Sequence, residues 1–266
     1  MSVEVSALWT YPVKSMAGVG QLTVDVNDWG PVGDRRWMLV DDSNCFLTQR
    51  QLPRMCRLGA EALEDGLRLW NLDKPENNVD VVFSLMREYC HVQVWSDMSL
   101  AQDAGDEAAD WLSHQLGQPV RLCYMTDDSF RQVDLGYARQ GDRVGFADGF
   151  PFLLCNDASL AALCTSLGRD IAMLRFRPNI VVTGAPAFAE DNWRGIRIAG
   201  IEFELLKPCA RCAIPTINPL DASRETDVFK VLKAERQRDG QVFFGQNMLH
   251  RGQGSITVGD DVTLLD

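Results

Sequence analysis

The stretch 195–216, GIRIAGIEFELLKPCARCAIPT, joins a strand-like pattern to two cysteines three positions apart. Apolar residues recur at 196–198 and 201–205, on either side of Ala199-Gly200. Two short β-branched and aromatic runs that flank a tight turn containing glycine predict a β-hairpin. We therefore expect sheet structure to deliver the chain to Cys209 and Cys212.

Short strand patterns also fill the first hundred residues. Apolar alternation predicts strands at 3–5, 22–26, 37–40, 67–70, 79–83 and 92–95. Gly30-Pro31, Asp65-Gly66 and the polar run 73–78 are typical of turns between such strands. The pattern indicates a compact, mostly antiparallel β domain.

Helical periodicity marks three segments, at 104–116, 156–167 and 227–236. Asp103 is the expected N-cap of the first helix, and Gly117 its stop. Since this helix follows the β-rich region, we expect it to form the hinge between two domains.

The second helix has its expected N-cap at Asn156 or Asp157 and its stop at Gly168. After the third helix, apolar residues alternate over 255–265 around a Gly-Asp pair. This last alternation predicts a closing β-hairpin.

Length and composition are those of a globular protein with two domains. The chain has 266 residues, of which 46% are hydrophobic and 24% charged. The change of pattern after Val120 divides it into 1–120 and 121–266. We predict an α+β, predominantly β fold of two barrel-like domains with a few helices.

The charge and the N-terminus limit the possible partners and compartments. With a net charge of −11, long-range attraction to nucleic acid or to an anionic membrane is not expected. No apolar stretch approaches the length that crosses a bilayer, and the first residues lack the pattern of a signal peptide. We expect a cytoplasmic location.

The segment around Cys209 and Cys212 carries most of the chemistry, and the residues alone leave several uses open. A structural zinc site needs a second Cys or His pair, and His91, His114 and His250 are isolated in the sequence. A thioredoxin-like couple needs the pair at a helix N-terminus, and two packed thiols need no function at all. Lys207 and Arg211, with no carboxylate between 204 and 221, favour a thiolate. A thiolate is a good ligand for a thiophilic metal.

Cations also recur where strands begin or end. Lys14 and Ser15 follow an apolar strand, whereas Arg35 and Arg177 each precede one. Any one of them has an ordinary reading as a solvated or ion-paired residue. Together with Arg211, they supply the several donors that an anionic, phosphate-bearing ligand requires.

These motifs, in this order, resemble the MOSC family, within it the branch of the mitochondrial amidoxime-reducing component and its bacterial relatives. The resemblance covers nearly the whole chain. Its first part, similar to an N-terminal β-barrel domain, contains YPVKS (11–15), DRRW (34–37) and TQR (48–50). Its second part, similar to the MOSC domain, contains FADG (146–149), NDASL (156–160), FRPNI (176–180), CARC (209–212) and GD (259–260).

The resemblance implies a molybdenum–molybdopterin cofactor lodged in a cleft between the two domains. Cys212 matches the family's molybdenum ligand and catalytic centre, and Cys209 matches a cysteine without that role. The remaining positions that match cofactor-binding residues are Lys14, Ser15, Arg35, Gly149, Phe150, Arg177, Asn179, Ala210 and Arg211. At Gly149 and Phe150 animal members have hydroxyl residues, so only backbone contacts carry over.

The activity implied is reductive removal of oxygen from N-hydroxylated compounds such as hydroxylamines, amidoximes or hydroxylaminopurines. No iron–sulfur, flavin or dinucleotide motif is visible. Electrons would therefore come from a separate flavoprotein reductase, ferredoxin-like or cytochrome-type protein. Asp148 is the one candidate proton donor. Two other roles are a sulfur carrier and a cofactor-binding protein without turnover.

Overall fold

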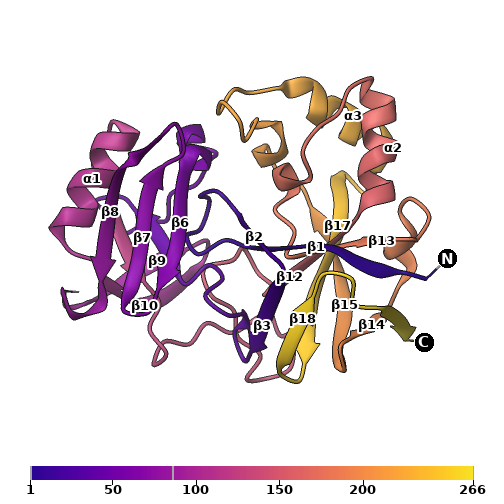
Figure 1. The fold of residues 1–266 in the computed structure, drawn as a ribbon, viewed down its shortest axis with the longest axis horizontal. Helices are drawn as coiled ribbons and strands as arrows, with labels where there is room; N and C mark the ends of the chain where they lie inside the picture. The colour runs from indigo at the N-terminus through magenta and orange to yellow at the C-terminus, as the bar shows by residue number, and fades with distance from the viewer. Residues whose placement is uncertain (1, 86, 266) are drawn as a thin grey trace.

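The computed structural model describes residues 2–85 and 87–265. Strands predominate over the three α-helices in these residues, which confirms the α+β, predominantly β prediction. Figure 1 shows two lobes with the segment around β1 and β2 between them. Of the helices described, none is long and apolar enough to span a membrane.

A nine-stranded sheet forms the C-terminal lobe. Its order is β19 (Val262–Leu265), β14 (Gly195–Ile198), β15 (Ile201–Ala210), β17 (Gln241–Arg251), β12 (Phe152–Asn156), β13 (Ile180–Thr183), β1 (Glu4–Thr10) and β2 (Val19–Gln21), with β16 (Gln237–Arg238) beside β17. The expected hairpin of β14 and β15 is present and leads to Cys209. β1 comes from the start of the chain, yet it pairs with β13, with Leu8 opposite Ile180. The large sheet therefore contains strands from both sides of residue 120. The domain boundary at residue 120 stays a prediction.

Two separate cores cover the two faces of this sheet. The helices α2 (Asp157–Leu167) and α3 (Thr226–Arg236) pack on one face, where Leu153 and Cys155 are buried with them. The opposite face buries Phe152 and Leu154 against β3 (Thr23–Asn27), β4 (Gly30–Pro31) and β18 (Gly254–Thr257). The period-2 alternation along β12 places these neighbours on opposite faces.

The N-terminal lobe consists of two smaller sheets and one helix. One sheet has the order β5 (Trp37–Val40), β11 (Arg121–Tyr124), β10 (Asp97–Asp103) and β9 (Tyr89–Val94), and the other has β6 (Leu58–Leu63), β7 (Gly66–Asn71) and β8 (Lys74–Val82). The helix α1 (Asp106–Leu116) buries Leu112 in the core between them. Val13 and Met16 belong to the same core, because the chain dips into this lobe between β1 and β2. That dip positions Lys14 and Ser15 at the boundary between the lobes.

Short 3-10 helices complete the connections. They are η1 (Pro53–Arg57), η2 (Phe83–Leu85), η3 (Met173–Phe176), η4 (Ala189–Asn192) and η5 (Ile214–Thr216). The first and last begin with or contain a proline near their N-terminus, where its missing N–H costs little.

Local signals at helix ends are largely confirmed. Gly117 and Gly168 adopt left-handed conformations that end α1 and α2. The Asn156 side chain caps α2 by accepting from the amide of Ala158, as expected. The expected N-cap of α1 is wrong by two residues: Gly105 is the N-cap, and Asp103 instead accepts from the Gly105 amide at 2.7 Å.

Three predictions about arrangement are wrong. The helix α1 is not a hinge, since it packs on β8 and β11 within the N-terminal lobe (Figure 1). Most of the polar run 73–78 is strand, because β8 starts at Lys74 on an exposed edge where polar side chains face solvent. The closing hairpin does not form: β18 pairs with β3, and β19 pairs with β14. Alternation identified both strands but could not identify their partners.

Candidate functional site

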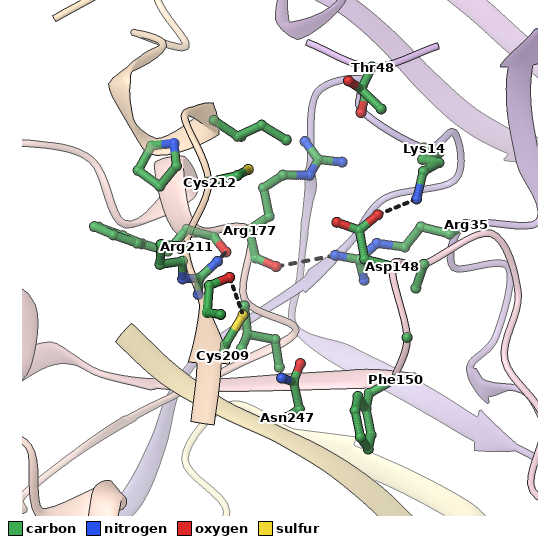
Figure 2. Close-up of a pocket in the computed structure, with 18 of the residues that line it drawn as sticks. Lys14, Arg35, Thr48, Asp148, Phe150, Arg177, Cys209, Arg211, Cys212 and Asn247 are labelled. Carbon is green, nitrogen blue, oxygen red and sulfur yellow. Dashed lines mark hydrogen bonds and ion pairs between the residues drawn. The ribbon is translucent and has the colours of Figure 1, made fainter. Parts of the chain in front are cut away.

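A cavity between the two lobes brings together all ten residues singled out from the sequence. They are Lys14, Ser15, Arg35, Gly149, Phe150, Arg177, Asn179, Ala210, Arg211 and Cys212. Figure 2 shows Lys14 and Thr48 on one side and Arg211 and Cys212 on the other. We call the first side, with Lys14, Ser15, Arg35 and Thr48, the N-terminal wall, and the second side, with Arg177, Asn179 and 210–212, the C-terminal wall.

Lys14 is buried in the N-terminal wall and donates to two acceptors of the protein. Its ammonium donates to the carbonyl of Phe146 at 2.6 Å and to the carboxylate of Asp148 at 2.5 Å. Burial lowers the pKa of Lys14, although the neighbouring Asp148 opposes that shift. The Asp148 side chain is 59% exposed, so solvent reaches this pair from the cavity.

Arg35 is also compensated within the protein. Its guanidinium pairs with the buried carboxylate of Asp34 and donates to the Asn179 amide oxygen at 2.9 Å. A further donation, at 3.2 Å, goes to the carbonyl of Arg177 in the opposite wall (Figure 2). Burial raises the pKa of Asp34, and Arg35 offsets part of that rise. Arg35 thus fastens the two walls together.

The side-chain amide of Asn179 is also hydrogen-bonded within the protein. Besides accepting from Arg35, its oxygen accepts from the amide of Leu153 at 3.3 Å, and its nitrogen donates to the Trp9 carbonyl at 3.2 Å. It lines the cavity, but its hydrogen bonds position β1, β12 and β13 relative to one another.

Arg177 differs from the other cations of the site. Its guanidinium stacks on the Tyr11 ring at 4.2 Å and donates through Nη1 to the carbonyl of Met16 at 2.6 Å. Within the described part of the chain, its buried Nη2 has no hydrogen-bond partner. Burial lowers the pKa of Arg177 to about 10, so the side chain is a cation at neutral pH. A buried charged donor without an acceptor indicates a binding position for an anionic or oxygen-rich group.

The backbone of both walls is strained at predicted positions. Ser15, Arg35 and Arg177 have φ values of 66°, 45° and 55°, in a region that side chains other than glycine rarely adopt. Such conformations persist only where surrounding structure enforces them, and they concentrate at functional sites.

The two cysteines have different surroundings. Cys209, the penultimate residue of β15, packs against the core beneath α2 and α3. Burial raises the pKa of its thiol, and nearby Arg211 offsets this only in part. Cys212 follows the strand and is exposed at the cavity mouth. The pair does not lie at the N-terminus of an α-helix, since only the 3-10 helix η5 follows it directly and α3 starts at Thr226. The described residues contain no group of three or more His, Cys, Asp or Glu side chains placed to hold one metal.

The cations expected beside the thiols are only partly where the sequence suggested. Lys207 lies over the Tyr137 ring at 4.6 Å, and Arg211 donates to the carbonyls of Phe244 and Phe176. The cation in contact with Cys212 is Arg50, whose Nη1 lies 3.6 Å from the sulfur. Arg50 belongs to the TQR motif, but 162 residues separate it from Cys212, and no spacing rule connects them.

Other parts of the lining were either expected only as backbone or missed. A Cβ added at Gly149 would meet open space, whereas Phe150 packs edge-on against Tyr137 with ring centroids 6.0 Å apart. Thr48, Arg175 and Asn247 also line the cavity and were not predicted to do so. Asn247 lies on the central strand β17, where the polar pair Gln246-Asn247 interrupts an otherwise apolar run; that interruption was the available signal.

Comparison with known proteins agrees with the motif series. A model of the MOSC N-terminal beta barrel domain matches residues 2–119, and a model of the MOSC domain matches residues 141–263. Mitochondrial amidoxime-reducing component 1 of Mus musculus is 30% identical over 98% of this chain and 82% of its own length, and the Homo sapiens protein is 29% identical with the same coverage. A molybdenum cofactor sulfurase of Caenorhabditis elegans is 28% identical over 91% of this chain but only 33% of its own length. The chain belongs to the MOSC family, in the branch of the mitochondrial amidoxime-reducing components.

Proposed function

We propose that the cavity binds a molybdenum–molybdopterin cofactor and that Cys212 is the protein's ligand to the metal. The observation that carries the proposal is Arg177, a residue of the cavity lining whose buried Nη2 has no hydrogen-bond partner among the described residues. A phosphate-bearing pterin supplies the acceptor oxygens that this donor lacks. The names of the relatives, which refer to amidoxime reduction or to the molybdenum cofactor, support the same cofactor class.

The donor set fits such a group. Arg177 and Arg211 line the cavity without a carboxylate partner among the described residues, Lys14 and Arg35 line it as ion-paired cations, and Ser15 adds a hydroxyl. Gly149 leaves room for close approach of a ligand to the backbone. The exposed sulfur of Cys212 faces the mouth and suits a thiophilic metal. Gly149, Phe150, Asn179, Ala210 and Arg211 would shape the remainder of the pocket.

We further propose that the protein reduces N-hydroxylated compounds. The net reaction converts R–NHOH, two electrons and two protons into R–NH2 and water. Bound molybdenum supplies the two-electron redox chemistry, and the protein binds and orients the cofactor and substrate. The electrons would come from a separate flavoprotein reductase, ferredoxin-like or cytochrome-type protein.

The structure offers a reason to assign the protons to solvent rather than to Asp148. Partial burial raises the pKa of this carboxyl, but the charge and hydrogen bond of Lys14 lower it more, to below the usual Asp range. Asp148 is therefore ionised at neutral pH and holds Lys14 in place. Because the mouth of the cavity is open at Cys212 and Asp148, water can reach the reacting group there.

All eight cysteines are free thiols in the structure. Cysteines of this number without disulfides are typical of a reducing compartment, which supports a cytoplasmic location.

The exposure of Cys212 also suits a second candidate, the transfer of sulfur as a persulfide, as the name of the sulfurase relative suggests. Intact mass after mild treatment with a low-molecular-weight persulfide, which can transfer its outer sulfur to a thiol and leave as the donor thiol, distinguishes the two. If the protein is a sulfur carrier, the mass of the polypeptide should increase by one sulfur atom, located at Cys212. If it is a cofactor-loaded reductase, the mass of the polypeptide should not change.

The direct test is metal and pterin analysis of protein produced in a molybdenum-replete host. We expect up to one equivalent of each, and reduction of benzamidoxime or hydroxylaminopurine with reduced viologen but not with NADH or NADPH alone. Protein from a host unable to make the cofactor should fold but be inactive. Stoichiometric zinc in place of molybdenum would refute the proposal.

A further inference from the structure

Trp95 has an unusual place in the N-terminal lobe. It begins the two-residue turn that joins β9 to β10, and its φ is 57°. Turns of this kind normally use Gly, Asn or Asp, because bulky residues are strained at positive φ. The indole is nevertheless 46% exposed, so burial in the hydrophobic core does not explain why tryptophan is there.

The exposed indole is fixed by contacts with the cavity mouth. Its Nε1 donates to the carboxylate of Asp148 at 3.4 Å, and the Phe46 ring lies tilted against it with centroids 5.0 Å apart. The Arg50 guanidinium lies over the indole face, 4.6 Å from its centroid. Asp148 lines the cavity, so these contacts turn the indole toward the site rather than away from it.

Arg50 connects the indole to the candidate metal ligand. The same guanidinium that covers the indole places Nη1 3.6 Å from the sulfur of Cys212. The flat indole of Trp95 and the flat, cationic guanidinium of Arg50 therefore stack on each other beside the proposed reaction centre. We call this pair the stacking platform.

We propose that the stacking platform selects flat, conjugated N-hydroxylated substrates over aliphatic ones, a specificity that rests on the proposed reductase function. Indole and guanidinium planes both stack on conjugated ligands, and neither gains comparable contact with a small aliphatic hydroxylamine. The positive φ of Trp95 strains the turn, and such strain is expected where a turn must hold an indole toward a substrate.

The test compares Trp95→Asn with the wild type on benzamidoxime and on N-methylhydroxylamine, using viologen as donor. Asn tolerates positive φ, so the unfolding temperature should be unchanged or higher. We expect kcat/KM for benzamidoxime to fall about tenfold more than that for N-methylhydroxylamine. The loss should appear mainly in KM, because stacking contributes similarly to bound substrate and transition state. Trp95→Phe should restore part of the preference.

Tyr89→Asn is the matched control, since Tyr89 is an exposed aromatic residue on the same hairpin. It should leave the ratio of the two substrates unchanged. Equal losses on both substrates in Trp95→Asn would overturn the platform while leaving the reductase proposal intact. If the wild type reduces neither substrate, the reductase proposal fails. Calorimetric titration of both proteins with benzamidoxime then decides the platform, which is refuted if Trp95→Asn binds as tightly as the wild type.

Discussion

Both walls of the cavity contain cationic side chains, but the hydrogen-bond acceptors that these side chains contact differ in charge. In the N-terminal wall, Lys14 is paired with Asp148 and Arg35 with Asp34. In the C-terminal wall, Arg177 and Arg211 have only carbonyl oxygens as partners among the described residues. A carbonyl satisfies a donor without cancelling its charge. The C-terminal wall is therefore the side with free charge for an anionic ligand, and the N-terminal wall is chiefly a scaffold for it.

The largest expected effect separates the two thiols of the C-terminal wall. Cys212→Ser should abolish turnover while the protein stays folded and keeps pterin, because a hydroxyl changes the donor to the metal. Cys209→Ser should keep most activity and cost about 1 kcal/mol of stability, as for a packed thiol. The measurement is turnover of both variants at matched metal content. Near-equal activities of the two variants would mean that the two cysteines act together, as in a disulfide or a shared metal site. An active Cys212→Ser variant beside an inactive Cys209→Ser variant would mean that Cys209 is the metal ligand.

Arg35→Met tests the scaffold role of the N-terminal wall. This substitution leaves Asp34 buried and unpaired, so the free energy of unfolding should fall by about 3 kcal/mol or more. Denaturant unfolding of the cofactor-free protein measures this directly. If stability is unchanged and only cofactor content falls, Arg35 serves the ligand rather than the scaffold, and the contrast between the walls fails.

Arg177→Met tests the opposite expectation. Among the described residues, Arg177 has no carboxylate partner that its removal would leave unpaired, so the cofactor-free protein should unfold close to the wild-type midpoint. Loss of one charge-assisted hydrogen bond should lower retained pterin and molybdenum by at least about tenfold. Arg197→Met is a suitable control, because Arg197 is an exposed cation on β14 away from the cavity lining. Unchanged cofactor content in Arg177→Met would remove the main support for the proposed ligand.

The sequence predicts the elements of these walls better than their assembly. Periodicity located Trp37–Val40 to the residue, and capping residues located the ends of α2, because both are local properties. The pairing of β1 with β13 joins residues more than 170 positions apart, and hydrophobic alternation carries no information about partners.

The same limit explains which residues of the site could be located from the sequence. The motifs that carry the family resemblance identified ten residues of the cavity lining, since each motif includes a residue held at the lobe boundary. Proximity in sequence did not identify the cation that lies beside the Cys212 thiol. Lys207 is five residues from Cys212 yet lies over the Tyr137 ring, whereas Arg50 contacts the sulfur from the other lobe. Which cation faces a thiol depends on how the two lobes pack, and that is a tertiary property.

The smallest expected effect concerns Asp148, the anion that compensates the N-terminal wall. Lys14 holds the pKa of this carboxyl below its usual range, so Asp148 stays ionised throughout pH 5–8 and has no proton to donate there. Because its folded-state pKa is depressed, the stability that the pair contributes is present above the usual Asp range and is lost only at lower pH. In Asp148→Asn, Lys14 keeps the Phe146 carbonyl, and an amide oxygen replaces the carboxylate. Turnover should therefore remain within about twofold of wild type, with the same shape of pH profile between 5 and 8. A lost acidic limb or a loss of activity above tenfold would instead make Asp148 the proton donor, and the N-terminal wall would then take part in the chemistry.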